Sequence, residues 1–253
     1  MRSHAFLGDA LLPYQAAVTA EVAARTGMAI DATRTASLDD LDAIAAGEPA
    51  LLYLCGLPYT RLRDRGLPVE ALAAPVSALD PDAGPRYRSV LLARPGLAGA
   101  VLEGLAEARL AINGYDSMSG WVLPVGSGLP LERFAEVVVT GAHRASLDLL
   151  LAEGADAAPI DSMLLAGERM HDDRLGALPE LAAYGPSPAP PVVLVGGDAG
   201  LADELRSVHV ALHEDEAGRT ALGLGRMLRL EPVADADYDL TRDCDRRAAP
   251  WTP

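Results

Sequence analysis

Short runs of apolar residues alternate with longer amphipathic segments over most of this chain. Residues 50–54 and 192–195 are continuous apolar runs bounded by Gly or Pro. Residues 13–26 instead carry apolar side chains at helical spacing, with Pro13 in the first turn. This alternation predicts an α/β fold with mostly parallel sheets.

The same pattern assigns elements to much of the remaining sequence. It predicts strands at residues 87–93, 108–112, 137–139 and 155–160, and helices at residues 38–46, 141–153, 199–207 and 216–228. Residues 75–86 are rich in Pro, Asp and Gly and predict a loop, and the segment from Arg246 onward predicts a loose tail. Aromatic residues make up only 4% of the chain, so we expect a core of Leu, Ala and Val.

Two extended segments, residues 87–93 and 190–196, predict how the chain divides into domains. If both cross between two lobes, residues 94–189 form one lobe. Residues 1–86 and 197–253 together form the other. A chain that crosses twice makes a two-stranded hinge, which suits closure of the lobes around a ligand.

The charge of the chain restricts its partners. The 21 basic residues are all arginine and face 36 acidic residues, which gives a formal net charge of −15. Such a balance argues against a nucleic-acid partner and against docking on anionic lipid. A small anionic ligand remains compatible, because a few oriented N–H groups can hold an anion locally. The lack of lysine excludes Schiff-base chemistry and a lysine-containing phosphate loop.

The ends of the chain and its cysteines bear on location. The first residues have no apolar leader segment, and no apolar stretch is long enough to cross a bilayer. The sequence as written therefore predicts a cytoplasmic protein that is not a membrane protein, or a periplasmic or otherwise extracytoplasmic one if a leader has been removed. Cys55 and Cys244 are compatible either with one long-range disulfide or with two free thiols.

Three loops that follow apolar strands carry the candidate site residues. Ligands of open α/β sheets bind where strands end. Ser117 and Ser119 bracket the start of a predicted helix, where N–H groups favour an anion. His143 follows Gly141 at the start of the next helix, and Asp161 ends another apolar strand. The alternative without a ligand is that Ser117 or Asp116 simply caps a helix and that His143 is a cap or a surface residue.

Other combinations of residues give weaker indications of a catalytic or metal site. Ser117, His143 and Asp161 are the residue types of a hydrolytic triad, but no Gly-x-Ser-x-Gly turn surrounds either serine. The acidic runs at residues 171–173 and 213–216 contain histidine but lack metalloprotease spacing. We therefore expect neither a metal nor a cofactor.

The order of these segments resembles a known family. In sequence order they are Cys55–Tyr59, Tyr87–Ser89, Asn113 with Ser117–Gly120, Gly141–His143 and Ala155–Asp161. This order resembles the phosphate/phosphite/phosphonate-binding family of periplasmic-type substrate-binding proteins of ABC transporters. The resemblance covers about residues 50–165 and rests on the ordered set rather than on any single motif.

The resemblance implies a fold, a ligand and a partner. The fold would be the two-lobed type II periplasmic-binding-protein clamp, closing on a small phosphate- or phosphonate-like solute. The partner would be the membrane component of an ABC-type uptake system.

The resemblance also implies roles for individual residues. Ser117 and Ser119, with the nearby backbone N–H groups, would hold the oxyanion together with His143, and Met118 would add an apolar wall to the ligand site. Asp161 would face a protonated oxygen or an amine of the ligand. Tyr59 would form the wall contributed by the opposite lobe, and Tyr87 is a further candidate. Met118 stands where the family often has a hydroxyl residue, and Tyr115 and Trp121 flank the same loop.

Two other functions remain open from the sequence. Cytoplasmic proteins of this fold also act as enzymes on organic acids in cofactor biosynthesis, and that alternative predicts a strongly shifted pKa for His143 or Asp161. The third candidate function is that of a sensor or partner-binding protein, in which closure of the two lobes signals to another chain.

Overall fold

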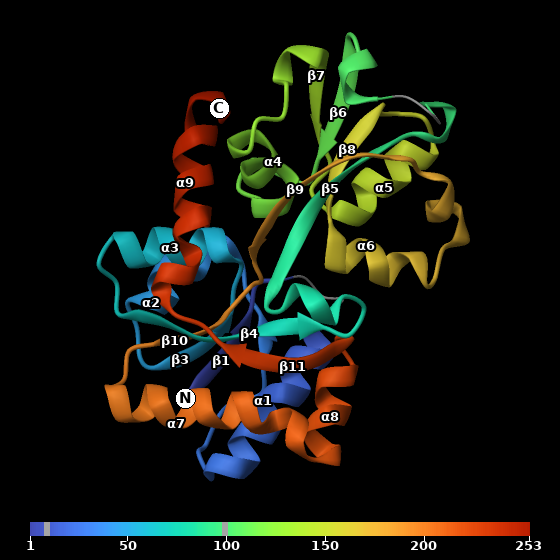
Figure 1. Ribbon diagram of the computed structural model, residues 1–253. Helices are drawn as coiled ribbons and strands as arrows, with labels where there is room; N and C mark the ends of the chain where they lie inside the picture. Colours follow the sequence, from blue (N-terminus) through green and yellow to red (C-terminus); the bar gives the residue numbers. More distant parts are fainter. Residues whose placement is uncertain (8–10, 98–100) are drawn as a thin grey trace. The chain divides into compact units, whose positions relative to one another are not determined.

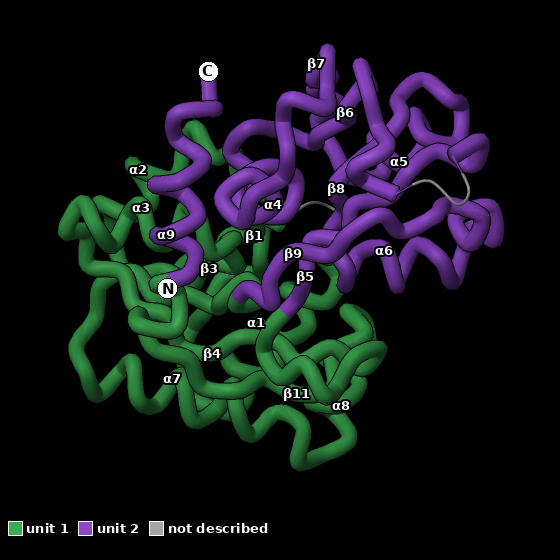
Figure 2. The backbone as a smooth tube through the Cα atoms, turned by 45° about the horizontal axis from the view of Figure 1, so that its top comes forward, with its two compact units in different colours: residues 1–86, 188–239 green, residues 87–187, 240–253 purple. Residues whose placement is uncertain are grey.

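The computed structural model describes residues 1–7, 11–97 and 101–253 (Figure 1). The chain divides into two compact units, coloured separately in Figure 2. Unit 1 comprises Met1–Arg86 and Pro188–Asp239, and unit 2 comprises Tyr87–Ser187 and Leu240–Pro253.

Unit 1 is built on a six-stranded sheet with the order β11-β4-β10-β3-β1-β2. The strands are β1 (Arg2–Ala5), β2 (Arg34–Thr35), β3 (Ala50–Tyr53), β4 (Val69–Ser77), β10 (Val192–Val195) and β11 (Met227–Pro232). Every residue of β3 and β10 is buried, as expected for central strands covered on both faces.

The helices of unit 1 cover both faces of this sheet (Figure 1). They are α1 (Leu12–Thr26), α2 (Leu41–Ala45), α3 (Gly56–Asp64), α7 (Ala199–Ala211) and α8 (Glu216–Gly223). In Figure 1 α1, α7 and α8 lie along one face, and α2 and α3 lie on the other. Helix α1 has Pro13 in its first turn and ends at Thr26, and the left-handed φ of 69° at the following Gly27 closes the last turn.

Unit 2 is built on a five-stranded sheet with the order β7-β6-β8-β5-β9. The strands are β5 (Arg86–Ala93), β6 (Ala108–Ile112), β7 (Phe134–Val139), β8 (Ala157–Asp161) and β9 (Glu180–Pro188). Besides several short 3-10 helices, the helical segments are the π-helix η6 (Met118–Val122), α4 (Leu123–Gly126), α5 (His143–Leu151), α6 (Ser162–Arg169) and α9 (Asp239–Ala248). Helices α5 and α6 pack against an aliphatic core that includes Leu92, Leu147 and Ile160, as the low aromatic content predicts.

The pairing of the strands corrects one part of the predicted fold. The two-lobed α/β class is confirmed, but the sheets are mixed rather than mostly parallel. In unit 1, β1 runs parallel to β2 and β3, whereas β10 runs antiparallel to β3 and β4, and β11 antiparallel to β4. The chain passes through unit 2 before β10 returns to this sheet, where β10 lies between β3 and β4 and runs antiparallel to both.

The division of the chain also differs from the predicted lobes and hinge. The chain changes unit after residues 86, 187 and 239, which makes three passages instead of two. Residues 87–93 lie within β5 of unit 2, and residues 192–195 form β10 of unit 1, so most of each predicted crossing is a sheet strand.

The C-terminal segment is the third difference. The sequence predicted a loose tail from Arg246 onward, within a lobe formed by residues 1–86 and 197–253, but α9 is a helix and Leu240–Pro253 belongs to unit 2. Cys244 and Ala248 are buried on one side of α9. Gly126 allows this approach, because a Cβ atom there would lie 2.5 Å from the Cys244 carbonyl oxygen.

Candidate functional site

The loop after β6 leads into η6, whose first turn offers free N–H groups. The Ser117 side chain accepts a hydrogen bond from the Gly120 N–H at 3.0 Å. The N–H groups of Trp121 and Val122 donate to the Ser117 carbonyl oxygen at 3.1 and 3.0 Å. First-turn N–H groups have no partner inside their own helix. Within the described ranges, those of Met118 and Ser119 have none outside it either, so both can donate to an anion.

Gly120 lets the preceding loop close against η6. A Cβ atom at residue 120 would lie 1.7 Å from Asn113 Oδ1, so the Asn113 side chain occupies the space that any other residue would need. Asn113 Oδ1 is itself buried without a hydrogen bond in the described part of the chain. The position therefore requires glycine, for steric reasons rather than for its φ angle.

Ser119 and His143 are in direct contact. Ser119 Oγ lies 2.8 Å from His143 Nε2. His143 is the first residue of α5, after Gly141, whose φ of 85° reverses the chain. The Thr140 hydroxyl holds this turn through hydrogen bonds to the Ile112 carbonyl oxygen and to Ser146 Oγ. The turn thereby fixes the imidazole against the start of η6.

His143 is uncharged at neutral pH. Burial lowers its pKa from 6.5 to about 4, because desolvation penalises the imidazolium form. Its Nδ1 atom is buried and makes no hydrogen bond to the described residues. A neutral imidazole can donate from one nitrogen and accept at the other, so it complements a ligand oxygen without adding a charge.

Asp161 ends β8 and caps α6. Its Oδ1 accepts hydrogen bonds from the N–H groups of Met163 and Leu164 at 2.8 and 3.1 Å. Burial raises its pKa from 3.8 to about 6, against the opposing effect of these two hydrogen bonds. Asp161 thus combines a helix-capping role, which the sequence did not predict, with a raised pKa.

Ser89 connects the Asp161 strand to the Ser119 helix. Ser89 of β5 pairs with Asp161 of β8 in the antiparallel register. Its fully buried hydroxyl donates to the Ser119 carbonyl oxygen at 2.6 Å. The sequence placed Ser89 in the family motif but did not predict it as a site residue. A buried hydroxyl within an otherwise apolar strand was the signal that could have singled it out.

The larger side chains beside Ser119 point away from solvent. Met118 is only 1% exposed, so its side chain packs into the interior of unit 2. Trp121 is buried as well, with its ring edge-on to Tyr115 at 4.9 Å and its Nε1 donating to Thr252 Oγ1 at 2.9 Å. The indole therefore ties η6 to the C-terminal segment.

Tyr59 and Tyr87 have different surroundings from the serines. Tyr59 lies on α3 of unit 1 and is 1% exposed, with its hydroxyl donating to Asp235 Oδ1 at 2.9 Å and its ring against Tyr238. Burial and the Asp235 carboxylate raise the pKa of Tyr59 well above its usual value. Tyr87 is a buried residue of β5 in unit 2. The structure thus brings together Ser117, Met118, Ser119, His143 and Asp161 in unit 2, whereas Tyr59 belongs to unit 1.

The structure also bears on metal binding, on the two cysteines and on membrane-spanning helices. Among residues 1–7, 11–97 and 101–253, no group of three or more His, Cys, Asp or Glu side chains is arranged to hold a metal ion. Cys55 and Cys244 are both free thiols. Within the same ranges no helix is both long and apolar enough to cross a membrane.

Comparison with known families identifies the chain. A family described as "ABC transporter, phosphonate, periplasmic substrate-binding protein" matches residues 14–238. The chain belongs to this family. The resemblance predicted from the ordered motifs is therefore confirmed, and the partner of such a protein is the membrane component of the transporter. The comparison with curated proteins gave no match.

Solved structures share the fold at low sequence identity. A binding-protein component of an ABC phosphonate transporter from Pseudomonas aeruginosa has a TM-score of 0.80 at 14% identity, covering 98% of this chain and 87% of that one. PhnD1 from Prochlorococcus marinus, in complex with methylphosphonate, has a TM-score of 0.80 at 14% identity over 98% of this chain and 97% of its own. XAC2383 from Xanthomonas citri, bound to chloride ion, has a TM-score of 0.72 at 14% identity and 99% coverage of both chains.

The enzyme alternative gains no support from these comparisons. The family is a substrate-binding component of a transporter. The shifted pKa values that this alternative predicted are present at His143 and Asp161, but burial is the largest cause at both residues. A buried site for a small anion shifts these groups in the same way.

Proposed function

We propose that this chain binds a small phosphonate- or phosphate-like anion at the start of η6, as the substrate-binding component of an uptake system. The observation that carries the proposal is the contact between Ser119 Oγ and His143 Nε2, beside two unused backbone N–H groups. These donors converge at one turn, which is the geometry that oxyanion binding requires. PhnD1, which shares the fold, is in complex with methylphosphonate.

The proposed cradle holds its anion with neutral donors. Its groups are the Met118 and Ser119 N–H groups, the Ser117 and Ser119 hydroxyls, and the neutral His143 ring. Arg144, next to His143 in sequence, does not contribute to the cradle, because its guanidinium group forms ion pairs with acidic residues. It contacts Asp148, Glu168 and Asp172 at 2.7, 2.9 and 2.8 Å. Oriented dipoles can bind an anion in a chain of net charge −15 because they act locally.

Asp161 and Tyr59 complete the proposed site. We assign Asp161 to a protonated oxygen or an amine of the ligand, because its Oδ2 makes no hydrogen bond to the described residues. With a pKa of about 6, its carboxyl group can take either form near neutral pH. Tyr59 is assigned to the wall from the other unit; its hydroxyl already donates to Asp235, so it would contribute its ring or accept a hydrogen bond.

The proposed location follows the family. Its members are described as periplasmic, which corresponds to the second of the two locations considered from the sequence. We therefore propose that the mature chain works outside the cytoplasm, where it captures solute for the membrane component of its transporter.

Calorimetric titration with phosphate, methylphosphonate and 2-aminoethylphosphonate tests the proposal. We expect saturable binding of at least one of them, and a loss of about 1–3 kcal/mol of binding free energy in His143→Ala, the value of a charge-assisted hydrogen bond. Ser119→Ala should lose less, because the backbone N–H groups remain.

Matched variants separate the cradle from general damage. Ser127→Ala changes an exposed serine at the far end of α4, and His213→Ala changes a histidine of unit 1. Both should bind like the unaltered protein. Unchanged affinity in a folded His143→Ala variant would contradict the assignment of His143, and no binding of any of the three anions would contradict the proposed ligand class.

A further inference from the structure

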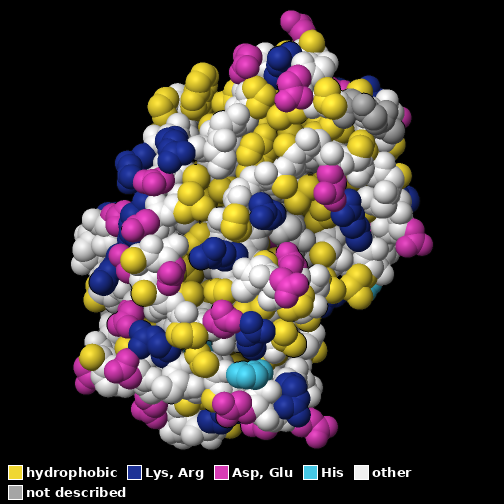
Figure 3. Space-filling model, viewed as in Figure 1, with side chains coloured by type: hydrophobic (Ala, Val, Ile, Leu, Met, Phe, Trp, Pro, Cys, Tyr) yellow, Lys and Arg dark blue, Asp and Glu magenta, His cyan; other side chains and the backbone are white. Residues whose placement is uncertain are grey.

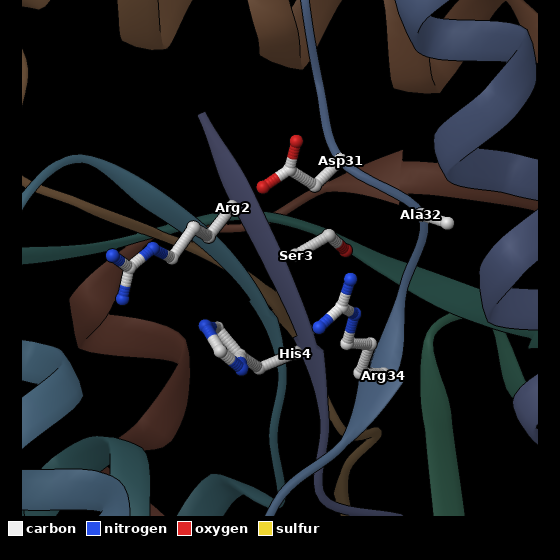
Figure 4. Close-up of a pocket in the computed structure, with 6 residues that line it drawn as sticks. All are labelled: Arg2, Ser3, His4, Asp31, Ala32 and Arg34. Atoms are coloured by element: carbon white, nitrogen blue, oxygen red, sulfur yellow. The ribbon is translucent and has the colours of Figure 1, made fainter.

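A groove in unit 1 lies at the β1–β2 edge of the sheet, among residues to which nothing above gives a function. It has a volume of about 600 Å³ and runs between this edge and α2. A smaller hollow of about 300 Å³ adjoins it around β1 and β2. Arg2, His4 and Arg34 line both (Figure 4).

Strand geometry places these three basic side chains on one face. Side chains alternate along a strand, so Arg2 and His4 of β1 project to the same side. Ser3 projects to the other, where its hydroxyl contacts Thr19 and Thr33. Arg34 of β2 is directly opposite His4 in the parallel register. Figure 4 shows the His4 ring between the guanidinium groups of Arg2 and Arg34.

This juxtaposition is unfavourable without a counter-charge. Like charges on neighbouring positions of a sheet repel each other. Across the described part of the chain, neither Arg2 nor Arg34 has an ion pair or side-chain hydrogen bond, although acids outnumber bases 36 to 21. His4 Nε2 is buried and lacks a partner among the same residues. Burial, followed by the charges of Arg2 and Arg34, lowers the pKa of His4.

The acids around the groove do not neutralise it. Asp31, Asp40 and Glu48 line the two hollows, but none forms an ion pair with these arginines. Asp42 of α2 is engaged by Arg65, with contacts of 2.7 and 2.9 Å. Other arginines of unit 1, such as Arg25 and Arg206, do have acidic partners. Figure 3 shows acidic and basic side chains interspersed on the face in view, so local placement matters more than net charge.

The structure assigns to this groove a second anion site, in which Arg2, His4 and Arg34 bind the phosphate or carboxylate group of a small organic molecule. Two guanidinium groups suit a planar or tetrahedral oxyanion, and His4 Nε2 adds a hydrogen-bonding atom. Ala43, Ile44 and Ala50 form an apolar part of the groove wall, which suits an organic group attached to the anion. The site is distinct from the η6 cradle, which lies in unit 2.

Proton NMR of the histidine rings in the full chain tests this site. The chain has five histidines, and His4→Gln assigns the His4 signal. We expect phenyl phosphate to shift the His4 signal in a saturable way, and inorganic phosphate to do so more weakly. The double variant Arg2→Gln/Arg34→Gln should weaken this binding by roughly tenfold or more, since each lost charge-assisted contact contributes to affinity.

Controls separate this site from the cradle and from misfolding. Arg206→Gln/Arg219→Gln removes the same charge from α7 and α8 of unit 1 and should leave the His4 titration unchanged. Arg2→Lys/Arg34→Lys keeps the charge and should retain part of the affinity. A His4 signal that neither probe shifts, or equal affinity in the two glutamine double variants, would overturn the site. A shift at His143 alone would support the cradle and overturn the groove.

Discussion

At the residue scale, the site depends on positions whose side chains fill space as much as on those that can bind a ligand. The clearest example is Gly120, because the Asn113 side-chain amide occupies the space that a Cβ atom at residue 120 would need. The sequence predicted Ser117 and Ser119 from their place at a helix start. Gly120 entered only as part of the family motif, and its steric role could not be predicted, because only the folded loop brings the Asn113 side chain close to it.

Gly120→Ala should destabilise unit 2 by about 1–3 kcal/mol, the usual cost of forcing extra volume into a packed site. The measurement is the melting temperature, compared with that of Gly176→Ala, where a Cβ would meet no atom within 4 Å. Adding Asn113→Ala to Gly120→Ala should recover part of the loss. Equal melting temperatures for the two glycine variants would contradict the steric account.

Asp161→Asn should stabilise the ligand-free protein at neutral pH. The pKa of Asp161 is raised from 3.8 to about 6, so the fold favours the protonated form. That contribution is complete below pH 3.8 and is lost as the pH rises through about 6. The gain should be roughly 1–3 kcal/mol near pH 7 and should vanish toward pH 4.

Thermal unfolding across this pH range measures the effect, with Asp116→Asn, an exposed residue of unit 2, as the control. A stability difference that does not change with pH would show that the Asp161 carboxyl is not held in the protonated form. The same Asp161→Asn variant should bind 2-aminoethylphosphonate more weakly than methylphosphonate, because the amine loses its carboxylate partner.

At the element scale, strands with clear apolar runs were predictable and the others were not. Strands β6 and β10 have the predicted bounds. Strand β4 was missed, and its end was assigned to a loop, because it is rich in alanine and contains Pro75. Strand β11 was also missed: its first two residues fell within the helix predicted at residues 216–228, which ends as α8 at Gly223. The secondary structure of these two segments is determined by pairing with neighbouring strands in the folded protein rather than by local propensity.

The C-terminal segment supports the helix that carries the proposed cradle. Trp121 of η6 donates to Thr252, and Arg247 donates to the Gly126 carbonyl oxygen at 3.3 Å. The sequence predicted a loose tail from Arg246 onward. The contacts that order it come from residues more than one hundred positions away.

Trp121→Phe should lower the stability of unit 2 by about 1 kcal/mol beyond the change in packing, through loss of the Thr252 hydrogen bond. It should also weaken anion binding modestly, because η6 is held less firmly. Trp251→Phe is the matched control, since Trp251 is 60% exposed. If both variants melt and bind alike, the C-terminal segment does not position η6.

At the scale of the whole molecule, the sequence predicted the two-lobed class and the family, and the family is confirmed over residues 14–238. It did not predict the third passage of the chain between units at residue 239. Extended apolar segments indicate where a chain can pass from one unit to the other. No local sequence pattern indicates that a helix belongs to a different unit from the residues just before it. The cradle residues are within one unit, which is why strand-end reasoning placed Ser117, Ser119, His143 and Asp161 in one region.

A crystal structure of the protein in complex with methylphosphonate or 2-aminoethylphosphonate tests the central claim most directly. We predict that phosphonate oxygens lie within hydrogen-bonding distance of Ser119 Oγ, the His143 ring and the Met118 and Ser119 N–H groups, with the amine of the second ligand near Asp161. A phosphonate bound away from η6, with the Ser119–His143 contact unchanged and unoccupied, would contradict the account.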